Sequence, residues 1–382
     1  MKIAFYAPLK SPDSPIPSGD RKMARQFIAC LRSEGHDVRL ISRLKSREAN
    51  GIQHKQIIIK NRSDKIIERL VNRYLKADSW RPDAWFTYHM FYKAPDWLGP
   101  AISKALKIPY LVAEASHAPK RKEGGWSFNQ KQVVLALKHA DAIIGLNSND
   151  EYCVKQVISS NCSYEFIKPF MGPDAAPSCG NKRDSHREEI CRELSLSKNE
   201  VLLLAVGMMR EGAKLESYKL LGRALSRLST SKAWRLIVAG DGKCRQEIEK
   251  CFGSETLFVG ALKEDQLFRY YCAADIFVWP AVQEAYGMAL LEAQWLGLPA
   301  VAGNSGGVSD IINDKVTGLL TQPGNVADFS SKLITLIENT DYREQMGTAA
   351  TKITRNEHSF EIAAKKVNLL VKNSLNSYRA KI

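Results

Sequence analysis

The feature that most restricts the fold is an alternation of short apolar runs and helical patterns, which occurs twice. In the first half, five apolar runs have the length and composition of buried parallel strands. The runs are KIAFYA (2–7), DVRLIS (37–42), AWFTYH (84–89), PYLVAE (109–114) and DAIIGL (141–146). Helical patterns such as 20–34 and 127–140 separate them. This half is therefore predicted to form a doubly wound α/β domain.

The alternation stops at 168–184, a stretch rich in Pro, Gly and charge, and then begins again. The second set of strands is predicted at EVLLLAVG (200–207), WRLIVAG (234–240), ETLFVG (255–260), DIFVWP (275–280) and PAVAG (299–303), with helices at about 215–229, 264–273 and 287–297. A mixed apolar and basic helix is predicted at 358–378. The chain is thus expected to contain two Rossmann-like domains whose strand ends face one cleft, where ligands bind.

The predicted boundaries follow from this pattern. A first domain is placed at 1–170, a linker at 171–195 and a second domain at 196–355. Residues 356–382 are expected to form a helix that crosses back to the first domain.

Composition excludes some classes of protein. The 382 residues are 45% hydrophobic and 25% charged, as in soluble globular proteins. No run approaches the roughly 18 apolar residues of a membrane-spanning helix. The start, MKIAFYAPLK, is too short in apolar residues for a signal peptide, so we expect a cytoplasmic protein. The eight cysteines include no Cys-x-x-Cys pair, which favours isolated buried thiols over a zinc or redox site.

Charge points to an anionic partner. The net charge is +14, and residues 1–82 hold 18 basic and 8 acidic residues, so most of the excess lies there. A basic surface of this kind suits a phosphorylated ligand, a nucleic acid or an acidic lipid.

Two cations follow the first strand of the second half. In AVGMMREGAKLESYKLL (205–221), Arg210 and Lys214 stand where a strand ends and a helix begins. Cations beside the positive end of a helix form an anion site, which a diphosphate would fill. The spacing matches neither a Walker loop nor Gly-x-Gly-x-x-Gly, so an ordinary solvated loop is an open alternative.

Two glycine-rich turns follow later strands. Gly240, Asp241 and Gly242 form a tight turn that would expose backbone groups to a flat ligand such as a base. Ser305 and Gly306, within GNSGGVSD (303–310), could direct amides toward a phosphate. For both turns the alternative is that the glycines serve only the packing of the chain and bind no ligand.

The segment QEAYGMALLE (283–292) carries two glutamates around an apolar helix start. Glu292 is the single charge of a helix that is apolar nearly all round, and an unpaired buried carboxylate is costly. It therefore needs a cleft, a cation or hydroxyl donors; a narrow solvent-exposed stripe is the alternative. Glu292 lies about 7.5 Å along the helix from Gly287, so Glu284 and Glu292 would touch different parts of one ligand. Paired sugar or ribose hydroxyls suit a carboxylate.

Together these motifs resemble the retaining family-4 glycosyltransferases, which have the GT-B fold and are bacterial-type group 1 glycosyl transferases. The mark of that family is Glu-x7-Glu, here Glu284 and Glu292. The further matches are VG…R…K, VAGDG, ADIFVWP, GLPAVAGNSGG and VTGLL, and the similarity runs from GHDV (35–38) to about residue 350. The chain departs from the family's pattern at Ser18-Gly19-Asp20, at Pro280-Ala281 and in the spacing of GMMR.

The resemblance implies a role for each motif. Arg210 and Lys214 would neutralise the donor diphosphate, and Gly240, Asp241 and Gly242 would lie beside the base. Glu284 with Tyr286, Gly287 and Met288 would bind the donor sugar and phosphate, and Glu292 would bind ribose. The domain at 1–170 would bind the acceptor, and the domain at 196–355 would bind the nucleotide-sugar. Gly19 would lie in the loop that reaches the donor phosphates and the acceptor, and His117 would face the transferred sugar. A packing role for His117 is the alternative.

The implied reaction is transfer of a sugar from a nucleotide-diphospho-sugar to a glycan or lipid-linked acceptor with retention, in cell-surface polysaccharide or lipopolysaccharide synthesis. No Asp-x-Asp is present, so neither a metal nor a cofactor is expected. Front-face attack is implied, in which Glu284 orients the sugar.

The basic first domain raises a further question. In RSDKIIERLVNRYLK (62–76), apolar residues would form one helix face and basic residues the other. The apolar face would either pack on its own domain or help the helix dock on the anionic inner face of the plasma membrane. Rival readings of the whole chain are a GT-B epimerase, a non-catalytic relative, or a polyanion-binding protein; no nucleic-acid recognition motif is present, so no nucleic-acid partner is expected.

Overall fold

The computed structural model describes residues 1–16, 18–176, 178–180, 182–284 and 286–380. Positions Pro17, Pro177, Asn181, Ala285 and 381–382, which fall in segments discussed above, lie outside the described residues. The chain divides into two compact units: unit 1 is Met1–Lys168 with the residues from Phe360 onwards, and unit 2 is Pro169–Ser359.

Unit 1 is built on a parallel sheet of six strands in the order β2-β1-β3-β4-β5-β6. The strands are β1 (Lys2–Tyr6), β2 (Asp37–Ser42), β3 (Ala84–Met90), β4 (Tyr110–Ala115), β5 (Ala142–Gly145) and β6 (Ser163–Phe166). The helices are α1 (Gly19–Ser33), α2 (Gln53–Tyr74), α3 (Gly99–Leu106), α4 (Ser127–His139), α5 (Ser148–Lys155) and α13 (Phe360–Arg379), with short turns η1 (Pro119–Arg121) and η2 (Gly124–Trp126).

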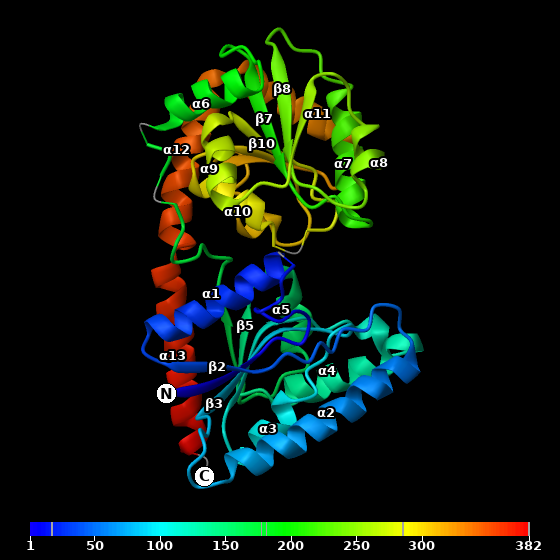
Figure 1. Cartoon of the computed structure of the whole chain (residues 1–382), viewed down its shortest axis with the longest axis vertical. Helices are drawn as coiled ribbons and strands as arrows, with labels where there is room; N and C mark the ends of the chain where they lie inside the picture. The colour runs from blue at the N-terminus through cyan, green and yellow to red at the C-terminus, as the bar shows by residue number, and fades with distance from the viewer. Residues whose placement is uncertain (17, 177, 181, 285, 381–382) are drawn as a thin grey trace. The chain divides into compact units, whose positions relative to one another are not determined.

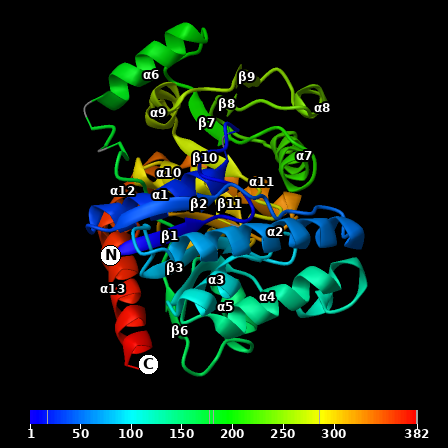
Figure 2. The same cartoon turned by 60° about the horizontal axis from the view of Figure 1, so that its bottom comes forward.

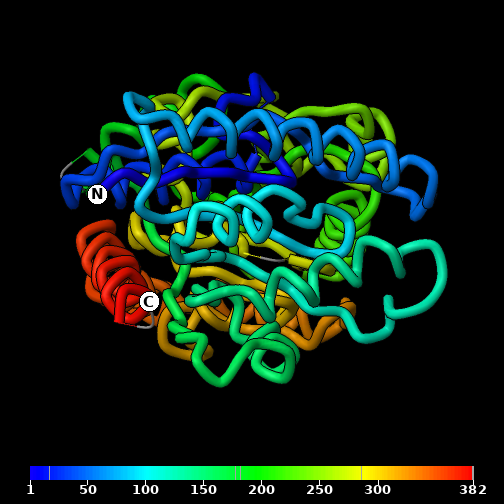
Figure 3. Tube along the Cα trace, turned by 90° about the horizontal axis from the view of Figure 1, so that it is seen from below, coloured from blue at the N-terminus to red at the C-terminus, as the bar shows by residue number. Residues whose placement is uncertain are grey.

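Helices cover both faces of this sheet. Helices α2, α3 and α4 lie side by side on one face (Figures 1 and 2), and α1 packs against α13 on the other. Figure 3 shows the amino terminus and α13 on the same side of the unit, where His36 Nε2 and Asn368 Oδ1 are 3.1 Å apart. Ser18 caps α1 by accepting a hydrogen bond from the Arg21 amide, a standard way to begin a helix.

Unit 2 repeats the scheme with the order β12-β11-β10-β7-β8-β9. Its strands are β7 (Val201–Val206), β8 (Trp234–Ala239), β9 (Thr256–Gly260), β10 (Ile276–Trp279), β11 (Ala300–Gly303) and β12 (Gly318–Thr321). Its helices are α6 (Lys182–Glu193), α7 (Ala213–Leu225), α8 (Arg245–Glu249), α9 (Glu264–Ala273), α10 (Met288–Trp295), α11 (Val326–Glu338) and α12 (Thr340–Glu357), with the turn η3 (Val308–Asp310).

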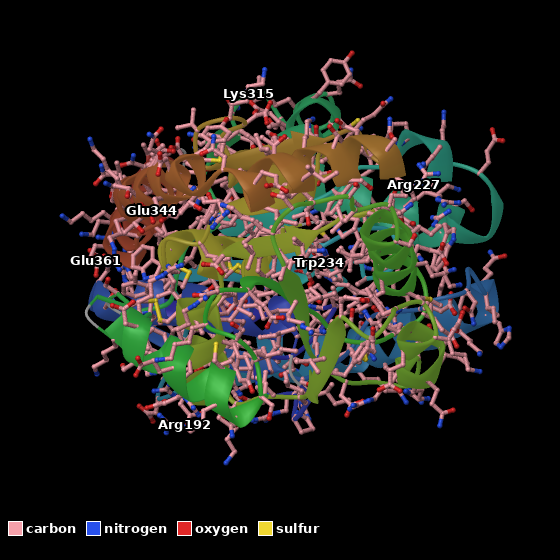
Figure 4. All side chains as sticks on the ribbon, turned by 90° about the horizontal axis from the view of Figure 1, so that it is seen from above. Arg192, Arg227, Trp234, Lys315, Glu344 and Glu361 are labelled. Atoms are coloured by element: carbon pink, nitrogen blue, oxygen red, sulfur yellow. A yellow bond between two sulfur atoms is a disulfide. The ribbon has the colours of Figure 1, made fainter. Side chains whose placement is uncertain are left out.

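The core of unit 2 lies between sheet and helices. Helices α7, α8 and α11 cover one face, and α9 and α10 cover the other, with α6 against α9 and α12 against α10 (Figure 1). The central strands are almost wholly buried, as continuous apolar runs require. Charged side chains on outer helices, such as Arg192 on α6 and Glu344 on α12, point away from the core (Figure 4). The predicted class, α/β with two Rossmann-like doubly wound halves, is confirmed.

Each sheet has one place where the chain reverses its direction of winding. In unit 1 the loops after β1 and β3 run to opposite sides, and in unit 2 the loops after β7 and β10 do so. Such a reversal opens a crevice at the carboxyl ends of the two strands, and ligands of open α/β sheets bind there.

Two features differ from expectation. The segment 171–195, expected to be a linker, contains α6, which packs on α9; α6 buries only Ile190 and Cys191 among its described residues, so its apolar periodicity is weak. The expectation of isolated thiols is wrong for Cys179 and Cys272, which form a disulfide across 93 positions of sequence. Cysteine spacing carries no information about partners that distant.

Candidate functional site

The reversal point of unit 2 holds a charged pair. Lys214, in the first turn of α7, places Nζ 2.6 Å from Oε2 of Glu284, in the loop before α10. The indole Nε1 of Trp279, the last residue of β10, donates to the same oxygen at 3.0 Å. The Lys214 ammonium also lies 4.7 Å from the centre of the Trp279 ring, within cation–π range. Two residues that sequence analysis proposed are therefore joined directly, 70 positions apart.

This pair is largely shielded from water. The side chains of Lys214 and Glu284 are 22% and 16% exposed, so their attraction is screened less than that of a surface pair. Trp279 is held in turn by an edge-to-face contact with Tyr218, at 5.1 Å between ring centres. The Tyr218 hydroxyl donates to the carbonyl of Gly207 at 2.8 Å, which fixes the end of β7. The positions of Lys214, Glu284 and Trp279 are thus fixed by aromatic packing as well as by the ion pair.

Two helices begin beside the pair. Helix α7 starts after Gly212 and α10 starts after Gly287; both glycines have a positive φ, and neither start has a side-chain cap. Uncapped amides at a helix start attract anions. Arg210 lies exposed in the loop before α7, and Met288 is the first residue of α10. The structure therefore brings two cations and two helix starts to one end of the sheet.

The predicted glycine turn after β8 is locked to the loop after β7. The Met209 amide donates to the carbonyl of Asp241 at 3.0 Å. A β-carbon on Gly240 would collide with the carbonyl oxygen of Gly207, and one on Gly242 would collide with that of Met209. Both glycines also have φ near +150°. These glycines are therefore required for close backbone approach, while the Asp241 side chain is exposed.

The loops after β10 and β11 are also joined to each other by hydrogen bonds. Ser305 Oγ donates to the Val282 carbonyl at 3.3 Å, and the Gly307 amide donates to the Glu284 carbonyl at 3.3 Å. The turn that contains Ser305 and Gly306 is thus brought to the Glu284 loop. The Ser305 hydroxyl itself is engaged within the protein.

Glu292 has a protein partner that sequence analysis did not anticipate. The buried Tyr271, on α9, donates its hydroxyl to Glu292 Oε2 at 3.0 Å, and burial together with Glu292 raises the pKa of this tyrosine. Glu292 is half-buried, so the expectation of hydroxyl donors is met in part from within the fold. Tyr286 and Gly287, between the two glutamates, are buried.

The two remaining candidates lie in unit 1. Gly19 is the first residue of α1, and an added β-carbon there would meet no atom within 4 Å. His117 is half-buried, and its Nδ1 lies 3.2 Å from the carbonyl oxygen of Cys153. Neither side-chain environment by itself assigns a role.

Sequence reasoning missed Trp279, Tyr218 and Tyr271, the aromatic residues that orient the charged groups. A signal for Trp279 was present, because a residue with a hydrogen-bond donor ends a buried strand only five positions before Glu284. Tyr271 gave no such signal, since it lies within an apolar helical pattern.

Two doubly wound units, one of them with a lysine–glutamate pair and two uncapped helix starts at its reversal point, define a protein of the GT-B fold class. Comparison with known proteins agrees: residues 186–353 match the family model of glycosyl transferases group 1. Over these residues the match supports the resemblance to group 1 glycosyl transferases that the motifs indicated.

One sequence relative and two solved structures are similar to this chain. Sulfoquinovosyl transferase SQD2 of Arabidopsis thaliana is 30% identical over 261 residues, which cover 66% of this chain and 50% of that protein. The chain thus spans half the length of that relative. Sucrose-phosphate synthase from Thermosynechococcus elongatus superposes with a TM-score of 0.75 at 16% identity, covering 98% of this chain and 99% of that one. HepE from Anabaena, solved in complex with UDP-glucose, gives 0.71 at 16% identity, over 99% and 100%. At these identities the two structures establish the fold alone.

Proposed function

We propose that this chain is a retaining glycosyltransferase of family 4. It transfers a sugar from a nucleotide-diphospho-sugar to a glycan or lipid-linked acceptor, in the synthesis of cell-surface polysaccharide or lipopolysaccharide. The observation that carries the proposal is the Lys214–Glu284 pair with Trp279, at the reversal point of the unit that matches the group 1 family. The UDP-glucose held by HepE, which shares the fold, supports a nucleotide-sugar donor.

The donor diphosphate would bind beside Lys214. An ammonium group has three N–H donors, and Glu284 takes one of them, so a phosphate oxygen can share the same cation. Arg210 and the amides at the starts of α7 and α10 add positive potential where the leaving diphosphate gains charge. The proposed mechanism needs no metal and no cofactor.

The base and the ribose of the donor would bind to the loops beside Lys214 and Glu284. The base would lie against the turn Gly240–Gly242, and the ribose hydroxyls would reach Glu292, which Tyr271 holds in place. The Ser305–Gly306 turn lies beside the Glu284 loop, to whose carbonyl the Gly307 amide donates, and would approach the phosphate.

Glu284 would orient the transferred sugar and would not attack it. Its two donors both reach Oε2, and among the described residues none donates to Oε1. A carboxylate with a cation and an indole on one oxygen is a weak nucleophile, while its other oxygen can accept a sugar hydroxyl. Retention would then come from attack by the acceptor on the face that the diphosphate leaves.

A thermal-shift screen with UDP-, GDP- and ADP-sugars is the first test, because a ligand that binds only the folded state raises its melting temperature. Incubation of the stabilising donor with acceptors, followed by anomeric analysis, tests transfer and retention. We expect Glu284→Ala to abolish transfer, and Glu344→Ala, which removes an exposed carboxylate on α12, to keep it. Full activity of Glu284→Ala would overturn the assignment.

The same incubation separates the alternatives. An epimerase would return an epimer of the donor sugar, and a non-catalytic relative would bind donor and leave it unchanged. A polyanion-binding protein would show no donor-specific shift and would be stabilised by heparin.

We also propose a cytoplasmic enzyme that docks on the anionic inner face of the plasma membrane through unit 1. The apolar side of α2 is not available for this, because Leu70 and Tyr74 are buried in the core of unit 1. The other side of the helix exposes basic residues: Arg62, Lys65, Arg69, Arg73 and, just beyond its end, Lys76. Ile57 and Ile58, near its start, are 40% and 47% exposed and could enter the lipid interface. No helix among the described residues is long and apolar enough to cross a bilayer.

Vesicle sedimentation tests this docking. Each basic residue near an anionic surface contributes about 1 kcal/mol, so replacing Arg62, Lys65 and Arg69 by Gln should weaken binding to phosphatidylglycerol vesicles by more than tenfold. A matched triple variant of exposed basic residues in unit 2, at Arg227 (Figure 4), Lys250 and Lys352, should bind like the wild type. Absence of wild-type binding at low salt would refute docking.

A further inference from the structure

Helix α9 carries a disulfide directly beside the tyrosine that holds Glu292. Cys272, in the last turn of α9, is bonded to Cys179, in the segment that precedes α6. Tyr271 comes just before Cys272 in the chain, and its hydroxyl donates to Glu292 Oε2, on α10, at 3.0 Å. The position of the residue that holds Glu292 is therefore linked to a covalent bond that can form and break.

The segment around Cys179 also contacts the end of α10. Cys179 Sγ lies 3.8 Å from the carbonyl oxygen of Leu296, the residue at which α10 ends. The indole Nε1 of Trp295 donates to the carbonyl of Ala176 at 2.8 Å. One short segment is thus attached to α9 by a disulfide and to the last turn of α10 by a hydrogen bond. The disulfide is therefore one of the contacts that fix α9 in relation to α10.

The disulfide is buried, but the element beside it is weakly packed. Cys179 is 6% exposed and Cys272 is fully buried, so a reductant reaches the sulfur atoms only when the segment opens. Helix α6, which follows Cys179, buries only Ile190 and Cys191 among its described residues. Regions with few buried apolar side chains open locally at a lower free energy than the core. The bond is therefore protected in the closed state and reducible through local opening.

Such a bond is reversible in the cytoplasmic location proposed above, because low-molecular-weight thiols keep most cysteines of that compartment reduced. When the bond forms, the thiols of Cys179 and Cys272 lose two electrons and two protons. Glutathione disulfide accepts both electrons and both protons, its own S–S bond breaks, and it leaves as two glutathione molecules. Two glutathione molecules reverse the exchange and leave as glutathione disulfide.

We propose that the Cys179–Cys272 disulfide is a redox switch that controls donor binding. When the bond is formed, α9 holds Tyr271 against Glu292, and the carboxylate is in place for the ribose hydroxyls of the donor. When both thiols are free, the end of α9 is less restrained, Tyr271 holds Glu292 less of the time, and the donor binds more weakly. This inference rests on the proposed function, because it requires a nucleotide at Glu292, and it adds a response to oxidation.

Isothermal titration calorimetry with UDP, GDP and ADP tests the switch. Each nucleotide is titrated into wild-type protein oxidised with glutathione disulfide and into protein reduced with dithiothreitol. We expect the Kd of the nucleotide that binds to be about three- to tenfold higher for the reduced form, part of the contribution of one hydrogen bond to a charged group. Alkylation after denaturation verifies the two forms, which should show six and eight reactive cysteines. Equal Kd values for the two forms would overturn the inference.

Three variants test the route from the disulfide to Glu292. Cys179→Ser should bind like the reduced wild type, with or without dithiothreitol. Tyr271→Phe keeps the ring and removes the hydroxyl, so it should bind weakly and equally in both redox states. Cys251→Ser removes a half-buried thiol of unit 2 outside the disulfide and should respond to reduction like the wild type. A redox response that persists in Tyr271→Phe or in Cys179→Ser would contradict the route.

Failure of the proposed function and failure of this inference give different results. If neither form binds any of the three nucleotides, the proposed function fails. If both forms bind one of them equally well, only the switch fails. We expect the reduced form to remain folded, because Arg187 of α6 keeps its ion pair with Asp275, at 2.9 Å, without the disulfide. A melting curve checks this, and unfolding of the reduced form at the titration temperature would show a structural bond and overturn the switch.

Discussion

Replacing Lys214 by Met should destabilise unit 2 by about 2 kcal/mol, since the change leaves Glu284 without its cation. Exposed ion pairs contribute about 0–1 kcal/mol, whereas breaking a fully buried pair costs about 3–5 kcal/mol. This pair lies between the two, with side chains 22% and 16% exposed, and the Trp279 hydrogen bond to Glu284 remains. For a domain of about 150–250 residues, such as unit 2, a loss of about 2 kcal/mol in the free energy of unfolding corresponds to a fall in Tm of about 4–8 °C.

A double-mutant cycle measured by differential scanning fluorimetry gives the sharper test. Glu284→Gln removes the charge that Lys214→Met would strand, so the double variant should lose about 1–2 kcal/mol less than the two single variants together. Lys214→Met should also lose the thermal shift produced by the nucleoside diphosphate of the preferred donor. Losses that add within about 0.5 kcal/mol would show that the pair is not coupled and would refute the reasoning.

Three further predictions test other parts of the structure. Gly240→Ala should destabilise unit 2 by about 3 kcal/mol or more, because its β-carbon would enter the Gly207 carbonyl at a positive φ, while Gly19→Ala should melt at or slightly above the wild-type temperature; equal melting temperatures would contradict the close approach. Alkylation of the unfolded, unreduced protein should modify six of the eight cysteines, and all eight after reduction; eight before reduction would exclude the Cys179–Cys272 disulfide. Burial alone would lower the pKa of His89, but Glu114 and Asp20 raise its folded-state value from 6.5 to about 9. The stabilisation by His89 is therefore complete below pH 6.5 and is lost as pH rises through 9. The Tm difference between the wild type and His89→Asn should therefore shrink between pH 7 and 10, and a constant difference would contradict this sign.

Much of the fold could be predicted because central parallel strands are buried on both faces and appear as continuous apolar runs. The missed strands are β6 and β12, each of four residues at a sheet edge. β6 is exposed or half-buried throughout, so its apolar pattern is weak, while β12 is largely buried but has too few residues to show a pattern. Helix α6 was missed for the same reason as β6, since most of its side chains face solvent.

The candidate site could be predicted only in its parts. The motifs indicated Glu284, Lys214 and the glycine turns, but their direct contacts depend on strand order, which local sequence does not specify. The contact between His89 and Glu114 of unit 1, 3.4 Å apart, was missed because both residues end strongly apolar runs, AWFTYH and PYLVAE. An ionisable residue at the end of a buried strand was the signal, since that end of a parallel strand is where ligands bind.

The locked turns after β7 and β8 also determine which changes the protein can accept. Gly240 and Gly242 fit backbone against backbone, so substitution there would alter the path of the loop that carries Arg210. Asp241, between them, has an exposed side chain, whose carboxylate accepts hydrogen bonds from the Gly242 amide at 2.7 Å and from Arg245 at 3.4 Å. A designer who wishes to alter base preference should therefore vary position 241 and keep both glycines, because the glycines set the path of the two loops while position 241 presents its side chain at the surface.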